Sequence, residues 1–232
     1  MRLRPWKEMI SKGFSFSSQN RNGECFCMTK TMKITYTAIF AAIAAVLMYF
    51  EFPLPFMPPF LKVDLSGAAI LIGAFIFGIG PAIMMILIKD LIHVTQTQTG
   101  GSGELQDFIL LALFVIVAVS VYKRYHTRKG AIIGCLLGTL VMSVAGMATN
   151  YLFIIPFYSK VMMMPLDAIF GACAAVNPHI SGMSTYLLIG VLPFNIVKGG
   201  LITFITVIVY KKLSVFIKSK QFDLHRHTET AK

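Results

Sequence analysis

Six apolar stretches restrict what this chain can fold into more than any other feature. They cover residues 34–51, 66–80, 81–95, 105–122, 130–155 and 188–210. Of the 232 residues, 56% are hydrophobic and 13% are charged, whereas about a quarter of the residues in a soluble domain are charged. Because roughly 20 apolar residues can cross a bilayer as a helix, the sequence predicts an all-α integral membrane protein with six transmembrane helices.

Lysine and arginine residues are distributed unevenly between the two sides of these stretches. Seven precede the first stretch, four lie between the fourth and the fifth, and six follow the sixth, whereas only Lys62 and Lys160 lie in the loops on the opposite side. The positive-inside rule therefore predicts that both termini are cytoplasmic. The net charge of +11 is interpreted as a topology signal in a lipid bilayer, and no nucleic acid partner is expected.

Polar segments flank a single predicted membrane domain. Residues 1–32 are expected to form a basic cytoplasmic extension, residues 33–212 the six-helix membrane domain, and residues 213–232 a basic cytoplasmic tail. The extension has no apolar core, so no signal peptide is expected. Cys25 and Cys27 lack the further ligands that structural zinc needs, so no metal site is expected.

The first apolar stretch and the segment after it carry two patterns. Ala38 and Ala42 are four residues apart, as are Ala41 and Ala45, and this spacing lets a second helix approach closely in lipid. The sequence EFPLPFMPPFLKVDLS follows. Its prolines prevent a helix, yet it is too apolar for an ordinary solvated loop, which predicts a stiff cover over a binding site.

Polar residues within the last two stretches suggest where a ligand binds. An ionisable side chain at the centre of a membrane helix costs about 2.5–3.5 kcal/mol, so Lys198 must be paired or must line a cavity. Asn195 shares its helix face, and Asn150 lies near the outer end of the fifth stretch. Ligand contact is the preferred interpretation. The alternative is that Lys198 pairs with a carboxylate such as Asp167 or extends to the membrane surface.

Four more ionisable residues lie near the third and fourth stretches. Lys89 and Asp90 are adjacent on one predicted helix, where neighbouring residues point about 100° apart, so they are not expected to face each other. Asp90 and His93 could together take part in proton coupling, and the alternative is that they form ordinary hydrogen bonds. Glu104 lies near the start of the fourth predicted helix, and its negative charge is expected to interact favourably with the dipole of that helix.

The segment 157–186 is long for a loop and rich in apolar residues, which predicts short helices that roof an outward-opening pocket. Several enzyme signatures are missing from the sequence. There is no G-x-x-x-x-G-K-[ST] phosphate loop and no H-E-x-x-H. The G-x-S-G match at residues 100–103 lies in a polar loop without a histidine base in the sixth stretch. No catalytic residues are therefore expected, and the chain is predicted not to be an enzyme.

Six segments resemble, in order, the riboflavin-specific substrate-binding (S) component of energy-coupling factor (ECF) vitamin transporters. They are FPLPFMPPFLKVDLSG, LIGAFIFGIGPAIMMILIKDLIH, GGSGELQDF, TNYLFIIPFY, MPLDAIFGACAAVNPHISG and VLPFNIVKGG. The resemblance covers about residues 33–212. It implies a six-helix protein of the bacterial plasma membrane that captures riboflavin from outside. It also implies two kinds of partner, a transmembrane coupling protein and two cytoplasmic ATPase subunits, and no cofactor besides the transported riboflavin.

The resemblance carries binding residues with it. Asn150 and Lys198 match family positions that contact the flavin ring, and the segment 61–64 matches the part of the first loop that closes on it. The substrate-binding residues predicted in this way, with the neighbouring Asn195, are Leu61, Lys62, Asp64, Asn150, Asn195 and Lys198. Apolar walls for the flavin are expected from Leu54, Phe56, Met57 and Phe60.

Two further expectations follow from the resemblance. The alanine face of the first helix, formed by Ala38, Ala41, Ala42 and Ala45, resembles the family's docking surface for the coupling protein, with packing inside this chain as the alternative. Gly67 departs from the family, which favours Asp soon after the DLS turn. Other functions left open are an S component for thiamine or pantothenate and a stand-alone proton-coupled secondary transporter.

Overall fold

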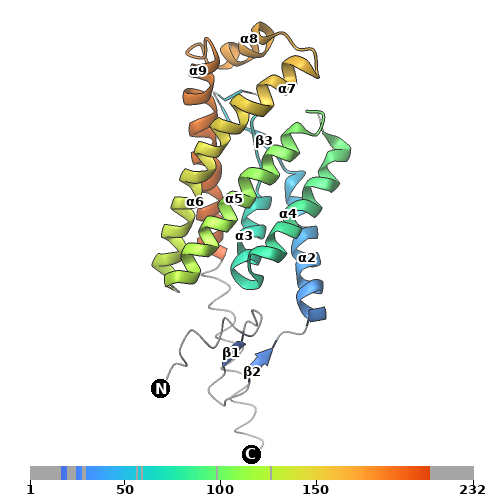
Figure 1. The fold of residues 1–232 in the computed structure, drawn as a ribbon, viewed down its shortest axis with the longest axis vertical. Coiled ribbons are helices and arrows are strands. Elements are labelled where there is room, and N and C mark those ends of the chain that lie inside the picture. The colour runs from blue at the N-terminus through green and yellow to red at the C-terminus, as the bar shows by residue number, and fades with distance from the viewer. Residues whose placement is uncertain are drawn as a thin grey trace, which may run out of the picture.

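The computed structural model describes residues 17–19, 25–27, 30–55, 57–58, 60–97, 99–125 and 127–209. Most of them lie in a bundle of helices that run roughly along one axis (Figure 1). The helices of the first half are α2 (Lys30–Met48), α3 (Ser66–Phe77), α4 (Ile79–His93) with the 3₁₀ turn η1 (Val94–Gln96), α5 (Ser102–Tyr125) and α6 (Arg128–Thr149). Those of the second half are α7 (Ile155–Lys160), α8 (Leu166–Val176) and α9 (Met183–Thr185).

Two π-helical segments extend two of the long helices. The segment η2 (Asn150–Ile154) joins α6 to α7, and η3 (Tyr186–Val191) joins α9 to the helical residues that end at Val209. A proline, Pro156 or Pro193, follows each segment by two residues. Because proline has no backbone N–H and clashes with the preceding turn, the wider π-helical turn is a way to continue the helix through it.

Five helices of the described part are long and apolar enough to cross a membrane. They are Lys30–Met48, Ile79–Gln96, Ser102–Tyr125, Lys129–Lys160 and Met183–Val209, the last of which is called the last helix below. This confirms a predominantly helical membrane protein. The helix over the fifth predicted stretch, 130–155, continues to Lys160, and the helix over the sixth, 188–210, already begins at Met183. Each of these helices includes one of the π-helical segments.

The second predicted span differs more from the structure. The apolar helix α3 has only 12 residues, so its length is about 18 Å, well short of the roughly 30 Å of a bilayer's hydrocarbon core. It stops at Gly78, whose positive φ of 97° reverses the chain into α4 at low steric cost. Gly78 therefore provides a tight turn between α3 and α4, but α3 alone does not span the membrane.

Short strands are the exception to the all-helical prediction. β3 (Phe52–Pro53) pairs with β4 (Lys62–Val63) in antiparallel register, Phe52 opposite Val63 and Pro53 opposite Lys62. The proline-rich cover is therefore a hairpin. In the predicted N-terminal extension, β1 (Ser17–Gln19) pairs with β2 (Cys25–Cys27). The other residues of that extension before Lys30, and the tail 213–232, lie outside the described residues.

Close helix packing holds the bundle together. A Cβ atom added at Gly134 of α6 would lie 2.6 Å from the backbone oxygen of Ala118, and one at Gly138 would lie 2.9 Å from that of Phe114. Only glycine permits so close an approach of α6 to α5, which is how helices associate in lipid.

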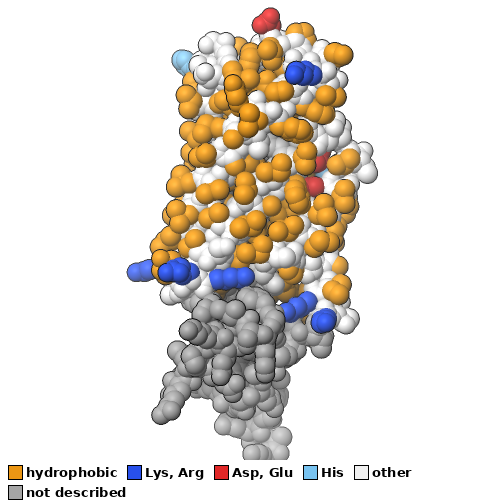
Figure 2. Space-filling model, in the orientation of Figure 1, with side chains coloured by type: hydrophobic (Ala, Val, Ile, Leu, Met, Phe, Trp, Pro, Cys, Tyr) orange, Lys and Arg blue, Asp and Glu red, His pale blue; other side chains and the backbone are white. Residues whose placement is uncertain are grey.

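The side chains of the outer surface are sorted by type along the bundle. Hydrophobic side chains cover its length, and most Lys and Arg side chains of the described part gather at one end, as Figure 2 shows. That end holds the start of α2 and the end of α5, with Lys123 and Arg124 in the last turn. The helix α8 lies across the opposite end (Figure 1).

Candidate functional site

A cavity of about 400 Å³ opens in the half of the bundle that α8 covers. This volume is within the usual range for small-molecule sites, about 300–1,000 Å³. The β3–β4 hairpin, the ends of α2 and α4, the start of α5, α6, α7, α8 and the last helix all contribute to its wall. The helix α8 and the covering hairpin thus confirm the predicted roof of short helices and the predicted cover.

The floor of the cavity is an ion-pair network that includes two buried lysines. The Lys198 ammonium lies 2.6 Å from an oxygen of Asp107 and 3.2 Å from one of Asp64. The second oxygen of Asp107 lies 2.5 Å from the ammonium of Lys89. Ser66 donates a hydrogen bond to Asp64. The floor therefore joins α4, α5, the start of α3 and the last helix through opposite charges.

One alternative for these charges is present and one expectation is wrong. Lys198 pairs with carboxylates, as the alternative to ligand contact had it, but its partners are Asp107 and Asp64 and not Asp167, which is exposed on α8. Lys89 and Asp90 do meet, at 2.5 Å, because the long lysine side chain reaches around the helix to its neighbour. Asp107 was missed, since a single Asp in the first turns of a helix resembles an ordinary charge near a helix start.

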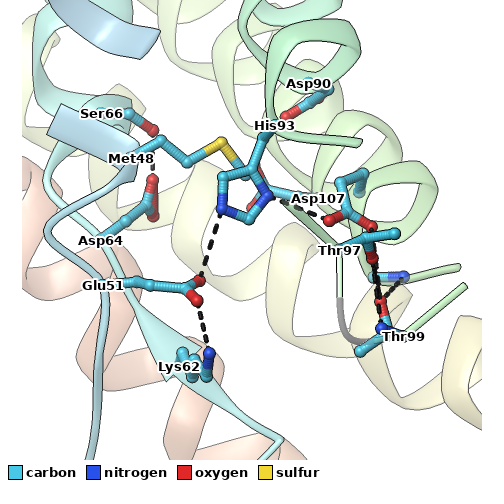
Figure 3. A network of polar contacts seen from close by, with 12 residues as sticks. Met48, Glu51, Lys62, Asp64, Ser66, Asp90, His93, Thr97, Thr99 and Asp107 are labelled. Carbon is cyan, nitrogen blue, oxygen red and sulfur yellow. Dashed lines mark hydrogen bonds and ion pairs between the residues drawn. The ribbon is translucent and has the colours of Figure 1, made fainter. Parts of the chain in front are cut away.

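A second polar network lies at the side of the cavity where the hairpin meets α4 and α5 (Figure 3). Glu51 pairs with Lys62 at 2.5 Å and lies 4.0 Å from Nε2 of His93. The Nδ1 atom of His93 lies 3.0 Å from Glu104, which also accepts a hydrogen bond of 2.9 Å from Thr97. Glu104 lies in the first turn of α5 as expected, but its carboxylate is directed to these side chains and lines the cavity.

The three predicted polar residues of the last two long helices lie near one another, but they differ in their access to the cavity. Asn195 and Lys198 line it. Asn195 is 2% exposed; its amide nitrogen donates to the Val191 carbonyl at 2.9 Å, and its Oδ1 has no hydrogen-bond partner within the described part of the chain. Asn150 does not line the cavity: its amide nitrogen donates to Gly146, and its Oδ1 accepts a bond of 2.8 Å from the Tyr186 hydroxyl. The polar atoms of the Asn150 side chain are thus hydrogen-bonded within the protein, beside the cavity wall.

The hairpin contributes three of the predicted residues to the wall. Leu61, Lys62 and Asp64 line the cavity, and so does Phe60. Leu54 and Met57 pack instead around Leu61, Val63 and Phe194, behind the lining, and Phe56 lies outside the described residues. Further apolar lining residues were not foreseen, and they are Met48, Leu110, Leu111, Met142, Met162, Met164, Ile169, Ala172 and Phe194.

The predicted docking surface on α2 is divided between two faces of the helix. Ala41 and Ala45 are buried in the bundle, with exposed fractions of 1% and 6%. This pair packs inside the chain, which is the alternative that the spacing left open. Ala38 and Ala42 are exposed and stay candidates for docking.

The unusual glycine after Ser66 fills a tight position beneath the cavity. A Cβ atom at Gly67 would lie 2.5 Å from Cδ1 of Ile202 and 3.3 Å from Leu111. No side chain fits here without movement of the last helix or its side chains. The carboxylates near the two buried lysines come instead from Asp64, Asp90 and Asp107.

Comparison with known proteins agrees with this arrangement. The family described as "ECF transporter, substrate-specific component" matches residues 32–210. The riboflavin transporter RibU of Streptococcus thermophilus is 32% identical over 83% of this chain and 88% of its own length. The riboflavin transporter FmnP of Bacillus subtilis is 30% identical over 85% of this chain and 100% of its own. RibU of Staphylococcus aureus is 29% identical over 82% and 95%.

A solved structure has the same fold. The S component described in "Structure and mechanism of the S component of a bacterial ECF transporter" superposes with a TM-score of 0.67, is 27% identical, and covers 82% of this chain and 99% of its own. The apolar helices and these relatives place the chain in the bacterial cell membrane as a multi-pass transport protein, not an enzyme. The chain belongs to the family of substrate-specific components of ECF transporters.

Proposed function

We propose that this chain captures riboflavin in the cavity beneath the hairpin and α8. The observation that carries the proposal is the pair Asn195 and Lys198 in the cavity wall. The pyrimidine edge of a flavin presents carbonyl acceptors and an N–H donor. A lysine ammonium can only donate, whereas the free Oδ1 of Asn195 can accept, so the two side chains match the two kinds of group on that edge.

The remaining binding residues follow from their place in the wall. Leu61, Lys62 and Asp64 hold the hairpin side of the ligand, and the methionines and leucines of the wall cover its apolar rings. Asn150 is proposed to act indirectly, from outside the cavity wall: its hydrogen bond to Tyr186 orients the helix that carries Asn195. Outside the site, exposed Ala38 and Ala42 are proposed to contact the coupling protein.

We infer six membrane-embedded helices with both termini in the cytoplasm. The basic end of the bundle supports this orientation through the positive-inside rule, and the cavity then opens to the outside. Release of riboflavin inward is proposed to need a transmembrane coupling protein and two ATPase subunits. Residues 1–32 and 213–232 are proposed to be cytoplasmic segments that flank the membrane domain.

Quenching of riboflavin fluorescence on titration with detergent-purified protein tests the proposal, after removal of any co-purified flavin. Saturable quenching near one riboflavin per chain is expected, with no competition from thiamine or pantothenate. Lys198→Ala is expected to weaken binding at least about tenfold, the equivalent of 1.4 kcal/mol. Absence of quenching by a folded sample, or equal competition by another vitamin, would overturn the assignment of riboflavin.

The stand-alone proton-coupled mechanism is tested separately. Riboflavin uptake into cells is expected to stop when the ATPase subunits are deleted. Uptake that persists without them, and that Asp90→Asn abolishes, would favour the proton-coupled alternative.

A further inference from the structure

Asp107 forms ion pairs with two buried lysines, Lys89 and Lys198, at the same time. It lies one and a half turns into α5, and its two carboxylate oxygens contact different lysines. Oδ1 accepts a hydrogen bond of 2.6 Å from Lys198 of the last helix, and Oδ2 accepts one of 2.5 Å from Lys89 of α4. The side chain of Asp107 is 13% exposed and lines the cavity. A single carboxylate thus connects three helices at the floor of the proposed riboflavin site.

The position of the Lys198 ammonium follows from this contact. An ammonium has three N–H donors. Asp107 accepts one at 2.6 Å, and Asp64 provides a second carboxylate at 3.2 Å from a different element. At least one donor is left, and Lys198 lines the cavity. Because a lysine side chain is flexible and its ammonium is strongly hydrated, two carboxylates from separate elements restrict where this donor can point.

Asp107 is better placed for this role than the other carboxylates of the floor. Asp90 lies on the same helix as Lys89 and pairs with it, and Asp64 lies in the short connection between β4 and α3, outside the helices. Asp107 is in a regular part of α5, which packs closely on α6. Charged groups that are held by rigid elements lose less freedom when a ligand arrives.

We propose that Asp107 is the positioning residue of the binding site, which holds the Lys198 ammonium toward the carbonyl group of a neutral heteroaromatic ligand. This inference rests on the proposed capture of riboflavin. It assigns to Asp107 an effect on binding that is exerted through Lys198 and not by contact with the flavin.

A double-mutant cycle tests the assignment. Riboflavin dissociation constants are measured by fluorescence quenching for the intact chain, Asp107→Asn, Lys198→Met and the double variant. Asp107→Asn is expected to weaken binding about tenfold in the intact background. In the Lys198→Met background the same change is expected to alter binding less than twofold, because the group on which Asp107 acts is gone. Asp167→Asn, the same chemical change at an exposed position outside the cavity, is the matched control.

A folding defect is separated from a positioning defect by two further measurements. Thermal unfolding of each ligand-free variant reports stability, and the visible absorption spectrum of bound riboflavin reports hydrogen bonding to the ring. Asp107→Asn is expected to shift the bound spectrum toward that of Lys198→Met. Asp107→Glu keeps the negative charge and moves the carboxylate by one methylene group. It is the variant to use if Asp107→Asn does not fold, and we expect it to weaken riboflavin binding at least threefold.

Each outcome decides between the possibilities. Wild-type affinity in Asp107→Asn, or in Asp107→Glu where that variant is used, overturns the assignment while the proposed function stands. An equally large loss with and without Lys198 also overturns it, because Asp107 then acts through Lys89 or on the fold. Failure of the intact chain to bind riboflavin contradicts the proposed function itself, a result that is distinct from both.

Discussion

The hydroxyl of Tyr186 donates a hydrogen bond of 2.8 Å to Oδ1 of Asn150, and this bond joins the two π-helical segments of the molecule. Each residue is the first of its segment, and both are buried, with exposed fractions of 0% and 1%. The amide nitrogen of Asn150 donates to Gly146, and Asn195 packs against the same glycine. The bond therefore holds the helix that carries the cavity residues Asn195 and Lys198 against α6.

Removal of this hydroxyl is expected to destabilise the protein. Tyr186→Phe leaves Oδ1 of Asn150 buried without its partner, which costs about 1–3 kcal/mol. For a chain of this size the melting temperature falls by roughly 2–4 °C per kcal/mol. Thermal unfolding in detergent measures the effect, and Tyr151→Phe, which changes an exposed tyrosine of η2 next to Asn150, is the control. Equal melting temperatures for the two variants would contradict the role given to the bond.

A methyl group at Gly67 is expected to be costly. The added Cβ of Gly67→Ala would lie 2.5 Å from Cδ1 of Ile202, which is 1% exposed, and overpacking of this kind costs about 1–3 kcal/mol. Gly200→Ala, in the same last helix with open space around the new atom, should be tolerated. The second change Ile202→Val removes the clashing methyl and should restore part of the lost stability. Thermal unfolding of Gly67→Ala, Gly200→Ala and the double variant checks the prediction, and no rescue by Ile202→Val would exclude this contact as the cause.

Larger side chains on the two faces of α2 are expected to have different effects, on uptake at the exposed face and on stability at the buried face. Ala42→Leu enlarges an exposed position and is expected to leave riboflavin affinity unchanged while it slows uptake into cells. Ala41→Leu enlarges a buried position and is expected to lower stability by about 1–3 kcal/mol. Val144→Leu, exposed on α6, is the control for a larger residue on the lipid-facing surface. Uptake at the normal rate by Ala42→Leu would remove the case for docking at this face.

The cavity should prefer a neutral ligand over a phosphorylated one. Its wall contains four carboxylates and two lysines, which are Glu51, Asp64, Glu104, Asp107, Lys62 and Lys198. A phosphate monoester carries a charge of about −1.5 to −2 at pH 7, so flavin mononucleotide is expected to bind more weakly than riboflavin.

Glu104→Gln tests the electrostatic origin of that preference. Removal of one like charge at several ångströms is worth about 1 kcal/mol in a partly solvated site, so the ratio of the two dissociation constants should fall roughly fivefold. Fluorescence titrations with both flavins give this ratio, and Asp167→Asn again serves as the exposed control. A ratio that Glu104→Gln does not change would show that size, not charge, sets the preference.

The sequence by itself determined the class of the molecule and its family. Apolar stretches and the distribution of basic residues are properties of the chain in a bilayer, and the ordered motifs carried the resemblance. They also indicated the residues Lys198 and Asn195 and the covering segment before α3.

The tertiary structure alone decided which of these residues meet. Lys198 could have paired with any carboxylate at its depth, and its partner Asp107 lies 91 positions away on another helix. The rotation of α2 placed Ala41 in the bundle and Ala42 outside, although both belong to the same spacing pattern. Asn150 pairs with Tyr186, 36 positions away, and is not among the residues that line the cavity. Hydropathy and residue spacing are local properties of the sequence. Ion pairing and burial depend on which helices pack together and on the rotation of each helix about its axis, and both are set by the tertiary structure.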